Sequence, residues 1–190
     1  MASDFADPLV YTGYQDNAVG NSVLVTPENK TKNQKYAIPF ATDPMKDGIV
    51  YASFLFKVTT LPAKGEPYII TFAGPNSKPF EEYNSNIMTR GHMFITAGSS
   101  SNKFGVKVSR SNAASKSTAL DQEFDLGTTY LAVMSYQINS TSGVQEFKFW
   151  INPATDGTEP TADFSSTDGQ NTNYGIQGVM IHQQKTSSVT

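Results

Sequence analysis

The sequence predicts an all-β domain built as a sandwich or a barrel. Three observations support this prediction: apolar residues alternate with polar ones, turn-forming residues separate these segments, and no window shows a sustained helical period. Aromatic residues make up 12% of the chain, and aromatic side chains favour strands over helices. Many short strands at fairly regular spacing are typical of both architectures, so the residue pattern alone leaves sandwich and barrel open.

The clearest alternation lies in Val50–Val58, where every second residue is apolar while Ser53 and Lys57 lie on the other face. A period of two is the signature of a strand with one buried face. Tyr130–Ile138 is apolar on both faces, as expected for a central strand. We expect strands at Ser22–Thr26, Lys35–Phe40, Ile49–Val58, Pro67–Ala73, Ile87–Ala97, Phe104–Arg110, Tyr130–Ile138, Glu146–Asn152 and Ile176–Gln183.

Helix-breaking residues are too frequent for a helix of ordinary length, except in Ala113–Leu120. Three long polar segments are expected to be loops: Pro75–Ser85, Gly98–Lys103 and Pro153–Tyr174. Loops carry function more often than cores do, so these segments are candidate binding regions.

Length and composition bound the class of protein. The 190 residues are expected to form one domain over 1–190, with 1–8 and 184–190 as flexible or edge-completing ends. A net charge of −3 speaks against a nucleic-acid partner, which requires a basic surface. The absence of cysteine excludes disulfides and thiolate chemistry. No apolar run is long enough to insert in a membrane, and the first residues do not form a signal peptide.

Seven segments carry recognisable motifs: Leu9–Tyr14, Gly20–Leu24, Val50–Phe56, Asp125–Tyr136, Phe147–Pro153, Gly157–Pro160 and Gly175–His182. In this order along the chain, these motifs resemble laminin-G-like, concanavalin A-like jelly rolls of bacterial surface and secreted proteins. This resemblance implies a two-sheet antiparallel jelly-roll sandwich and an extracellular or cell-surface location in a bacterium. The motifs are structural: Leu126–Tyr130 is a turn that feeds a core strand, and Trp150–Pro153 is a strand stopped by proline.

The resemblance also draws attention to the ends of the chain. Domains of this kind usually have a strand before the segment that matches Leu9–Tyr14 and another after the last apolar segment. We expect both closing strands to be absent or much reduced in this sequence, because few residues lie beyond either segment. We therefore expect an open sheet edge that a partner, a swapped terminus or residues 1–8 completes, because folded proteins rarely leave a long edge bare.

The catalytic signatures of this fold are not found. Glycosidases with this fold carry Glu-x-Asp-x-x-Glu on one strand, and the nearest match, Glu123-Phe-Asp125, lacks the second glutamate. Asp125 is interpreted as an ordinary turn residue. The two histidines, His92 and His182, lie in separate segments without a metal-ligand spacing. The sequence therefore predicts a protein that is not an enzyme.

Calcium is a possible cofactor, because laminin-G-like domains often hold one ion through loop carboxylates. Asp156, Asp163 and Asp168 share one long loop region, although their spacing does not match a dedicated calcium loop. The alternative interpretation is that these three side chains are solvated loop acids.

A glycan site would need an aromatic side chain beside planar polar groups. Three residue pairs are each expected to share a strand face, and together they would line a shallow groove on a concave sheet. The alternative interpretation is a solvated outer face on which the tryptophan is half packed. The pairs are Tyr51 with Lys57, Arg90 with His92, and Lys148 with Trp150.

Two function classes follow from these observations. The first is a non-catalytic carbohydrate-binding or adhesion module of an exported or surface protein, with a glycan as its partner. The second is a structural or interaction subunit of a cell-surface or virion assembly, whose open sheet edge is completed by a protein partner or neighbouring subunit. A glycoside hydrolase ranks third, because the pair of acidic residues is missing.

Overall fold

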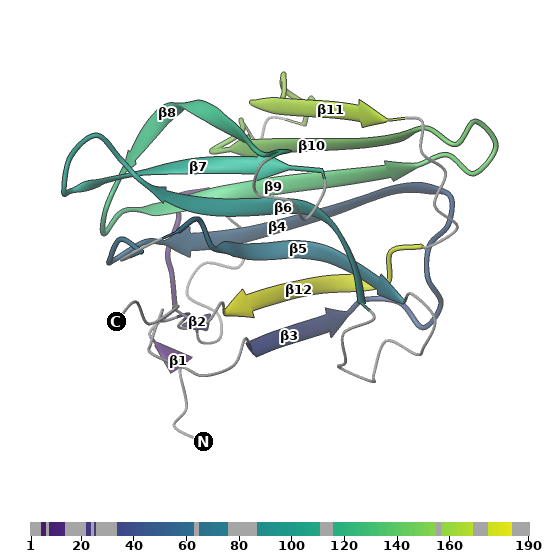
Figure 1. Ribbon diagram of the computed structural model, residues 1–190, viewed down its shortest axis with the longest axis horizontal. Helices are drawn as coiled ribbons and strands as arrows, with labels where there is room; N and C mark the ends of the chain where they lie inside the picture. Colours follow the sequence, from purple (N-terminus) through teal and green to yellow (C-terminus); the bar gives the residue numbers. More distant parts are fainter. Residues whose placement is uncertain are drawn as a thin grey trace.

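A computed structural model of the chain describes residues 5–6, 8–13, 22–23, 25, 34–62, 65–75, 87–110, 116–154, 157–168 and 175–183. Apart from Lys116, which has a 3-10 conformation, the regular structure of these residues is β-strand (Figure 1). The described part of the chain has no helix with the length and apolarity needed to cross a lipid bilayer. The strands are β1 (Phe5–Ala6), β2 (Ser22–Val23), β3 (Gln34–Pro39), β4 (Gly48–Lys57), β5 (Tyr68–Pro75), β6 (Ile87–Ala97), β7 (Lys103–Ser109), β8 (Thr118–Asp125), β9 (Thr129–Ile138), β10 (Gln145–Ile151), β11 (Phe164–Asp168) and β12 (Gly178–Gln183).

Two antiparallel sheets of different width form a sandwich. The long sheet has the order β3-β12-β5-β6-β7-β8, and the short sheet has the order β11-β10-β9-β4. β1 and β2 form a separate two-stranded sheet. The predicted all-β, two-sheet antiparallel jelly-roll sandwich is thereby confirmed.

The hydrophobic core lies between the facing sides of the two sheets. The long sheet contributes Phe72 and Phe104, and the short sheet contributes Met134, Phe147 and Phe149; all five are fully buried. Each fully buried side chain of this size stabilises the fold by roughly 1.5–3 kcal/mol. The alternate residues of Val50–Val58 pack against the same core, so the face predicted from their period of two is confirmed.

The structure corrects the expected boundaries at several places. Thr118–Asp125 is an edge strand rather than part of a helix, and it pairs with β7 through a register shift. β11 lies inside the expected loop Pro153–Tyr174; apart from Phe164 its side chains are polar, so no alternation marks it. β1 pairs with β2, whereas residues 184–190 lie outside the described residues.

A β-bulge at Gly91 reverses the faces of β6. Thr71 of β5 pairs with His92, but the next residue, Phe72, pairs with Arg90, so Gly91 is the extra residue. Gly91 has a φ of 63°, in the left-handed region that favours glycine. Arg90 and His92 would share a face in a regular strand, and the bulge places them on opposite faces of the long sheet.

Gly91→Ala is expected to destabilise the fold strongly. A Cβ at this position would lie 2.6 Å from the buried ring of Phe147, in addition to the strain of the left-handed backbone. The expected loss is about 2–5 kcal/mol of unfolding free energy in denaturant melts. Gly127→Ala is the matched control: its φ is 76° with nothing within 4 Å, so only backbone strain of about 1–2 kcal/mol applies. Equal losses in the two variants would contradict the crowding at Gly91.

Candidate functional site

Four of the six predicted ligand-binding residues lie on the outer face of the short sheet, which points away from the core. Tyr51 pairs in register with Ser135, and Ser135 pairs with Lys148, so these three side chains form one row across β4, β9 and β10. Trp150 lies on the same face, two residues after Lys148. Lys57 lies on this face too, but six residues from Tyr51, about 20 Å along the strand.

Residues 157–163, named here the crossover segment, pack over part of this outer face. The Trp150 indole N–H donates to the carbonyl oxygen of Pro160 at 3.0 Å. Asp163 accepts from the backbone N–H of Ile151 at 2.7 Å. Trp150 is consequently only 3% exposed. Trp150 therefore offers no aromatic surface to a groove, and the alternative interpretation of a half-packed tryptophan is wrong as well.

Glu159 of the crossover segment connects Tyr51 and Lys148. The Tyr51 hydroxyl donates to Glu159 Oε2 at 2.7 Å, and Lys148 Nζ lies 3.0 Å from Glu159 Oε1. These two hydrogen bonds hold the pKa of Glu159 below its usual range. The hydrogen bond to Glu159 in turn raises the pKa of Tyr51 and that of Lys148.

The aromatic ring that this face presents to solvent is that of Tyr51, which is 53% exposed. Ile49, two residues earlier on the same face of β4, is 48% exposed. We name Ile49, Tyr51, Lys148 and Glu159 the Tyr51 patch. It combines an apolar surface with a carboxylate and an ammonium group, whose positions are set by their mutual contacts.

Arg90 does not belong to this face. It points between the sheets, where its Nη1 donates to Gln145 Oε1 at 3.3 Å, and the Tyr136 hydroxyl donates to the same oxygen at 2.7 Å. Gln145 and Tyr136 are fully buried, and Arg90 is almost so. The expectation that Arg90 lines an open groove is therefore wrong, and its contacts join the two sheets.

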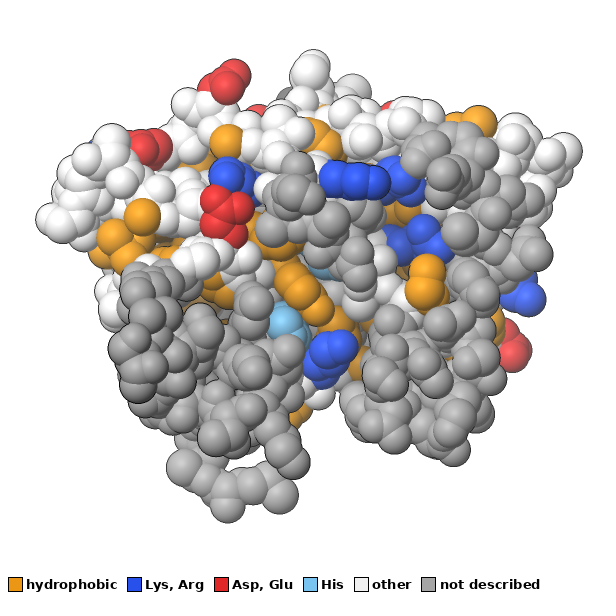
Figure 2. Space-filling view, in the orientation of Figure 1, with side chains coloured by type: hydrophobic (Ala, Val, Ile, Leu, Met, Phe, Trp, Pro, Cys, Tyr) orange, Lys and Arg blue, Asp and Glu red, His pale blue; other side chains and the backbone are white. Residues whose placement is uncertain are grey.

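His92 lies on the outer face of the long sheet, on the other side of the sandwich. The ring of Tyr68 is edge-on to His92, with centroids 5.0 Å apart, and stacks on His182 at 4.1 Å. Both histidines are buried. Figure 2 views this side of the molecule, where a histidine lies among hydrophobic and basic side chains. His92 therefore cannot share a groove with Tyr51 and Lys148.

The sequence analysis did not predict the role of Glu159 on the short sheet or the contact between Tyr68 and His182 on the long sheet. Glu159 carries no local signal, because its role depends on where the crossover segment lies over the sheet. The contact between Tyr68 and His182 joins β5 to β12, more than a hundred residues apart in the chain. The even spacing of Met180 and His182 on β12 is the one signal that could have assigned His182 to a sheet face.

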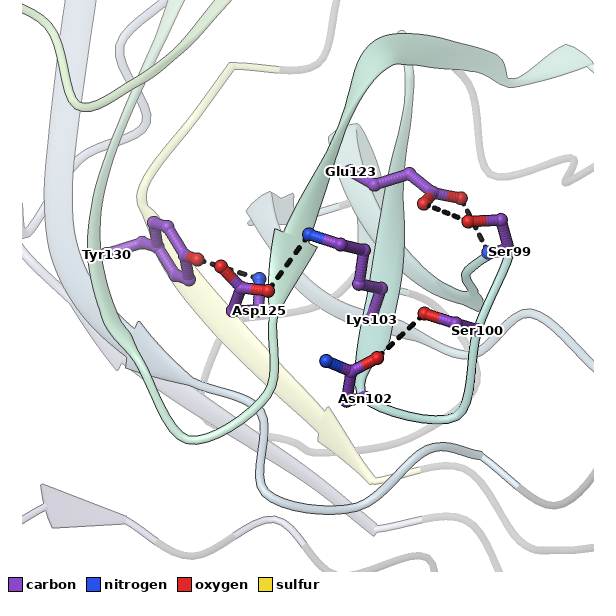
Figure 3. Close-up of polar contacts among 7 residues, drawn as sticks. All are labelled: Ser99, Ser100, Asn102, Lys103, Glu123, Asp125 and Tyr130. Carbon is purple, nitrogen blue, oxygen red and sulfur yellow. Dashed lines mark hydrogen bonds and ion pairs between the residues drawn. The ribbon is translucent and has the colours of Figure 1, made fainter.

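The two carboxylates that came nearest to a glycosidase signature are held in structural contacts (Figure 3). Glu123 accepts from the backbone N–H and the hydroxyl of Ser99, both at 2.6 Å. Asp125 pairs with Lys103 at 2.9 Å, and its backbone N–H donates to the Tyr130 hydroxyl. Both side chains thus fix the turns at one end of β7 and β8.

The predicted calcium residues are only partly described. Asp163 is described, and its contact with Ile151 is the one given above. Asp156 and the side chain of Asp168 lie outside the described residues. Within the described ranges, no group of three or more histidine, aspartate or glutamate side chains is arranged to hold a metal ion. Calcium binding through Asp156, Asp163 and Asp168 remains a prediction.

Asp163→Ala is expected to loosen the crossover segment over Trp150. The variant removes the acceptor of the Ile151 N–H, so stability should fall by about 1 kcal/mol. Trp150 is the single tryptophan of the chain, and its fluorescence therefore reports on this site alone. Quenching by acrylamide should be weak in the wild type and stronger in Asp163→Ala. Strong quenching in the folded wild type would contradict the burial of Trp150.

The free energy of unfolding is expected to decrease as the pH is lowered below about 6.5, because His182 becomes protonated. Burial lowers the pKa of His182 below its ordinary value of 6.5, so the folded state favours the neutral ring. The stabilisation is therefore complete above about pH 6.5 and is lost as the pH falls towards the folded-state pKa. His182→Phe keeps a ring stacked on Tyr68 and removes the titration. Denaturant melts between about pH 7.5 and 5.5 should show a smaller loss in this variant. Equal losses would contradict this role of His182.

No model of a known protein family matches the sequence, and no match was found among curated protein sequences. Among solved structures, an alginate lyase from Pseudomonas aeruginosa is similar, with a TM-score of 0.44 and 9% identity over 77% of this chain and 60% of that chain. A native heptameric SAP-like pentraxin from Limulus polyphemus is similar with a TM-score of 0.38 and 11% identity, over 78% of this chain and 66% of that chain. This chain thus matches less than two thirds of either protein, and the likeness is one of fold alone.

Proposed function

We propose that this protein is a non-catalytic carbohydrate-binding or adhesion module of an exported or surface protein in a bacterium. The Tyr51 patch is the proposed contact for the glycan. The observation that carries the proposal is the exposed Tyr51 ring fixed beside the Glu159–Lys148 pair. The resemblance of the chain's motifs to laminin-G-like, concanavalin A-like jelly rolls supports the same class of function.

The chemistry of the Tyr51 patch suits a sugar ring. The C–H face of a pyranose is apolar, and it packs on an aromatic ring such as that of Tyr51. Sugar hydroxyls can donate to the Glu159 carboxylate and accept from the Lys148 ammonium group, and hydrogen bonds to charged groups are the stronger kind. Because Glu159 holds both partners, fewer side chains need to be ordered when a ligand binds.

Tyr51→Ala and Lys148→Ala are expected to weaken glycan binding at least tenfold, or about 1.4 kcal/mol. The ligand would be found on an array of bacterial, plant and animal oligosaccharides, with and without calcium. Affinity would then be measured by calorimetry with the best soluble oligosaccharide. Both variants should keep the wild-type fold, because exposed ion pairs contribute only about 0–1 kcal/mol to stability.

Lys107→Ala provides a matched control on the opposite side of the sandwich. Lys107 is ion-paired with Glu66 as Lys148 is with Glu159, and the two lysine side chains are 29% and 31% exposed. Lys107 pairs in register with Phe94, on the outer face of the long sheet near His92. Unchanged affinity is expected for this variant. Loss of binding in Lys107→Ala alone would move the site to the long sheet, and no binding to any glycan would overturn the proposed function.

A further inference from the structure

Lys148 of the Tyr51 patch lies between two carboxylates. Its Nζ is 3.0 Å from Glu159 Oε1 and 3.6 Å from Glu146 Oε2. The hydrogen bond to Glu159 raises the pKa of Lys148, and the negative charge of Glu146 raises it as well. Lys148 therefore carries its full charge at neutral pH, and that charge is balanced at close range by the two carboxylates.

Glu146 is held in place by contacts from both sides. It lies two residues before Lys148 on β10, so the two side chains share the outer face of the short sheet. The Ser165 hydroxyl of β11 donates to Glu146 Oε1 at 3.2 Å, and Glu146 Oε2 faces Lys148. The second carboxylate thus stays beside the ammonium group in the folded protein.

The surroundings of the Tyr51 ring are consequently negative. The two carboxylates, Glu146 and Glu159, and the one ammonium group of Lys148 give a net charge of −1. Lys57 is the one other charged residue that the described strands carry on this face, and it lies about 20 Å along β4 from Tyr51. This separation exceeds the screening length of about 10 Å in 0.1 M salt. The described part of the face therefore offers an anion near Tyr51 no cation that lacks a counter-charge.

Uncharged polar side chains border the Tyr51 patch. Gln137 of β9 pairs in register with Ile49, and Ser165 of β11 pairs with Lys148. Thr167 follows Ser165 on the same face of β11, and both are exposed. Amide and hydroxyl groups can donate and accept hydrogen bonds, as sugar hydroxyls do. The border of the patch thus suits a ligand that is rich in hydroxyl groups.

We propose, on the basis of the glycan site proposed above, that the Tyr51 patch selects neutral oligosaccharides and rejects acidic ones. A uronate or sulfate group near Tyr51 would meet the carboxylates of Glu146 and Glu159, which already share the ammonium group of Lys148. Like charges that face each other across an interface suppress the wrong partner. A neutral sugar meets no such repulsion, and its C–H face packs on the Tyr51 ring while its hydroxyls contact the polar groups.

Matched pairs of oligosaccharides test this selectivity. The members of a pair share one linkage and differ only at C6, which is a hydroxymethyl group in glucose, mannose or galactose and a carboxylate in glucuronate, mannuronate or galacturonate. For each pair whose neutral member binds, affinity for the acidic member should be at least about fivefold weaker in low salt. Because salt screens charges, this difference should shrink between about 0.02 M and about 1 M sodium chloride.

Glu146→Gln should relax the selectivity. The variant leaves Lys148 with one carboxylate partner and keeps an acceptor for the Ser165 hydroxyl. Affinity for the acidic member should rise at least about threefold in low salt, while affinity for the neutral member should change less than about twofold.

Glu66→Gln is the matched control for this change. Glu66 is ion-paired with Lys107 on the outer face of the long sheet, and its side chain is 34% exposed, against 26% for Glu146. The control alters the net charge of the chain by the same amount, so any effect of overall charge would occur in both variants. Both affinities should equal those of the wild type.

Circular dichroism establishes that both variants are folded. A wild type that binds the acidic member as tightly as the neutral one, or more tightly, overturns the selectivity and leaves the carbohydrate-binding function standing. So does an unchanged affinity of Glu146→Gln for the acidic member, or an equal gain in Glu66→Gln. Absence of binding to either member of every pair would instead overturn the proposed function, and the selectivity with it.

Discussion

Successive side chains of a β-strand point to opposite faces, and this constraint places the functional side chains that the strands carry. It sends Phe54 and Phe149 into the core, and Tyr51 and Lys148 to the outer face of the short sheet. The extra residue at Gly91 inverts the rule within β6. Arg90 is therefore available to join the sheets through Gln145, while His92 contacts Tyr68 on the opposite surface.

The sequence could predict what depends on alternation alone. The core face of β4 and the shared face of Lys148 and Trp150 require only the period of two. The faces on which Arg90 and His92 lie could be predicted only with knowledge of the bulge at Gly91. A glycine within a strand is a weak signal of a bulge. The burial of Trp150 and the contacts of Glu159 arise where a loop crosses a sheet, and no local pattern encodes a contact between distant segments.

The two outer surfaces of the sandwich differ in physical character. On the short sheet, polar contacts are exposed and lie around one aromatic ring, so water can exchange freely with another polar ligand. On the long sheet, histidine rings pack with Tyr68 and Phe94, so their surroundings behave as a secondary core. A polar network in solvent tolerates substitution, whereas a buried one is coupled to the stability of the whole domain.

The position of β12 has a consequence for the order of assembly during synthesis. β5 to β8 and β9 to β11 are runs of neighbouring hairpins, whose contacts are close in sequence and form early. β12 inserts between β3 and β5, and it leaves the ribosome after every other described strand. β3 has no neighbour in its sheet until then. The nascent chain therefore waits with this strand unpaired, a state in which exposed edges depend on chaperones for protection.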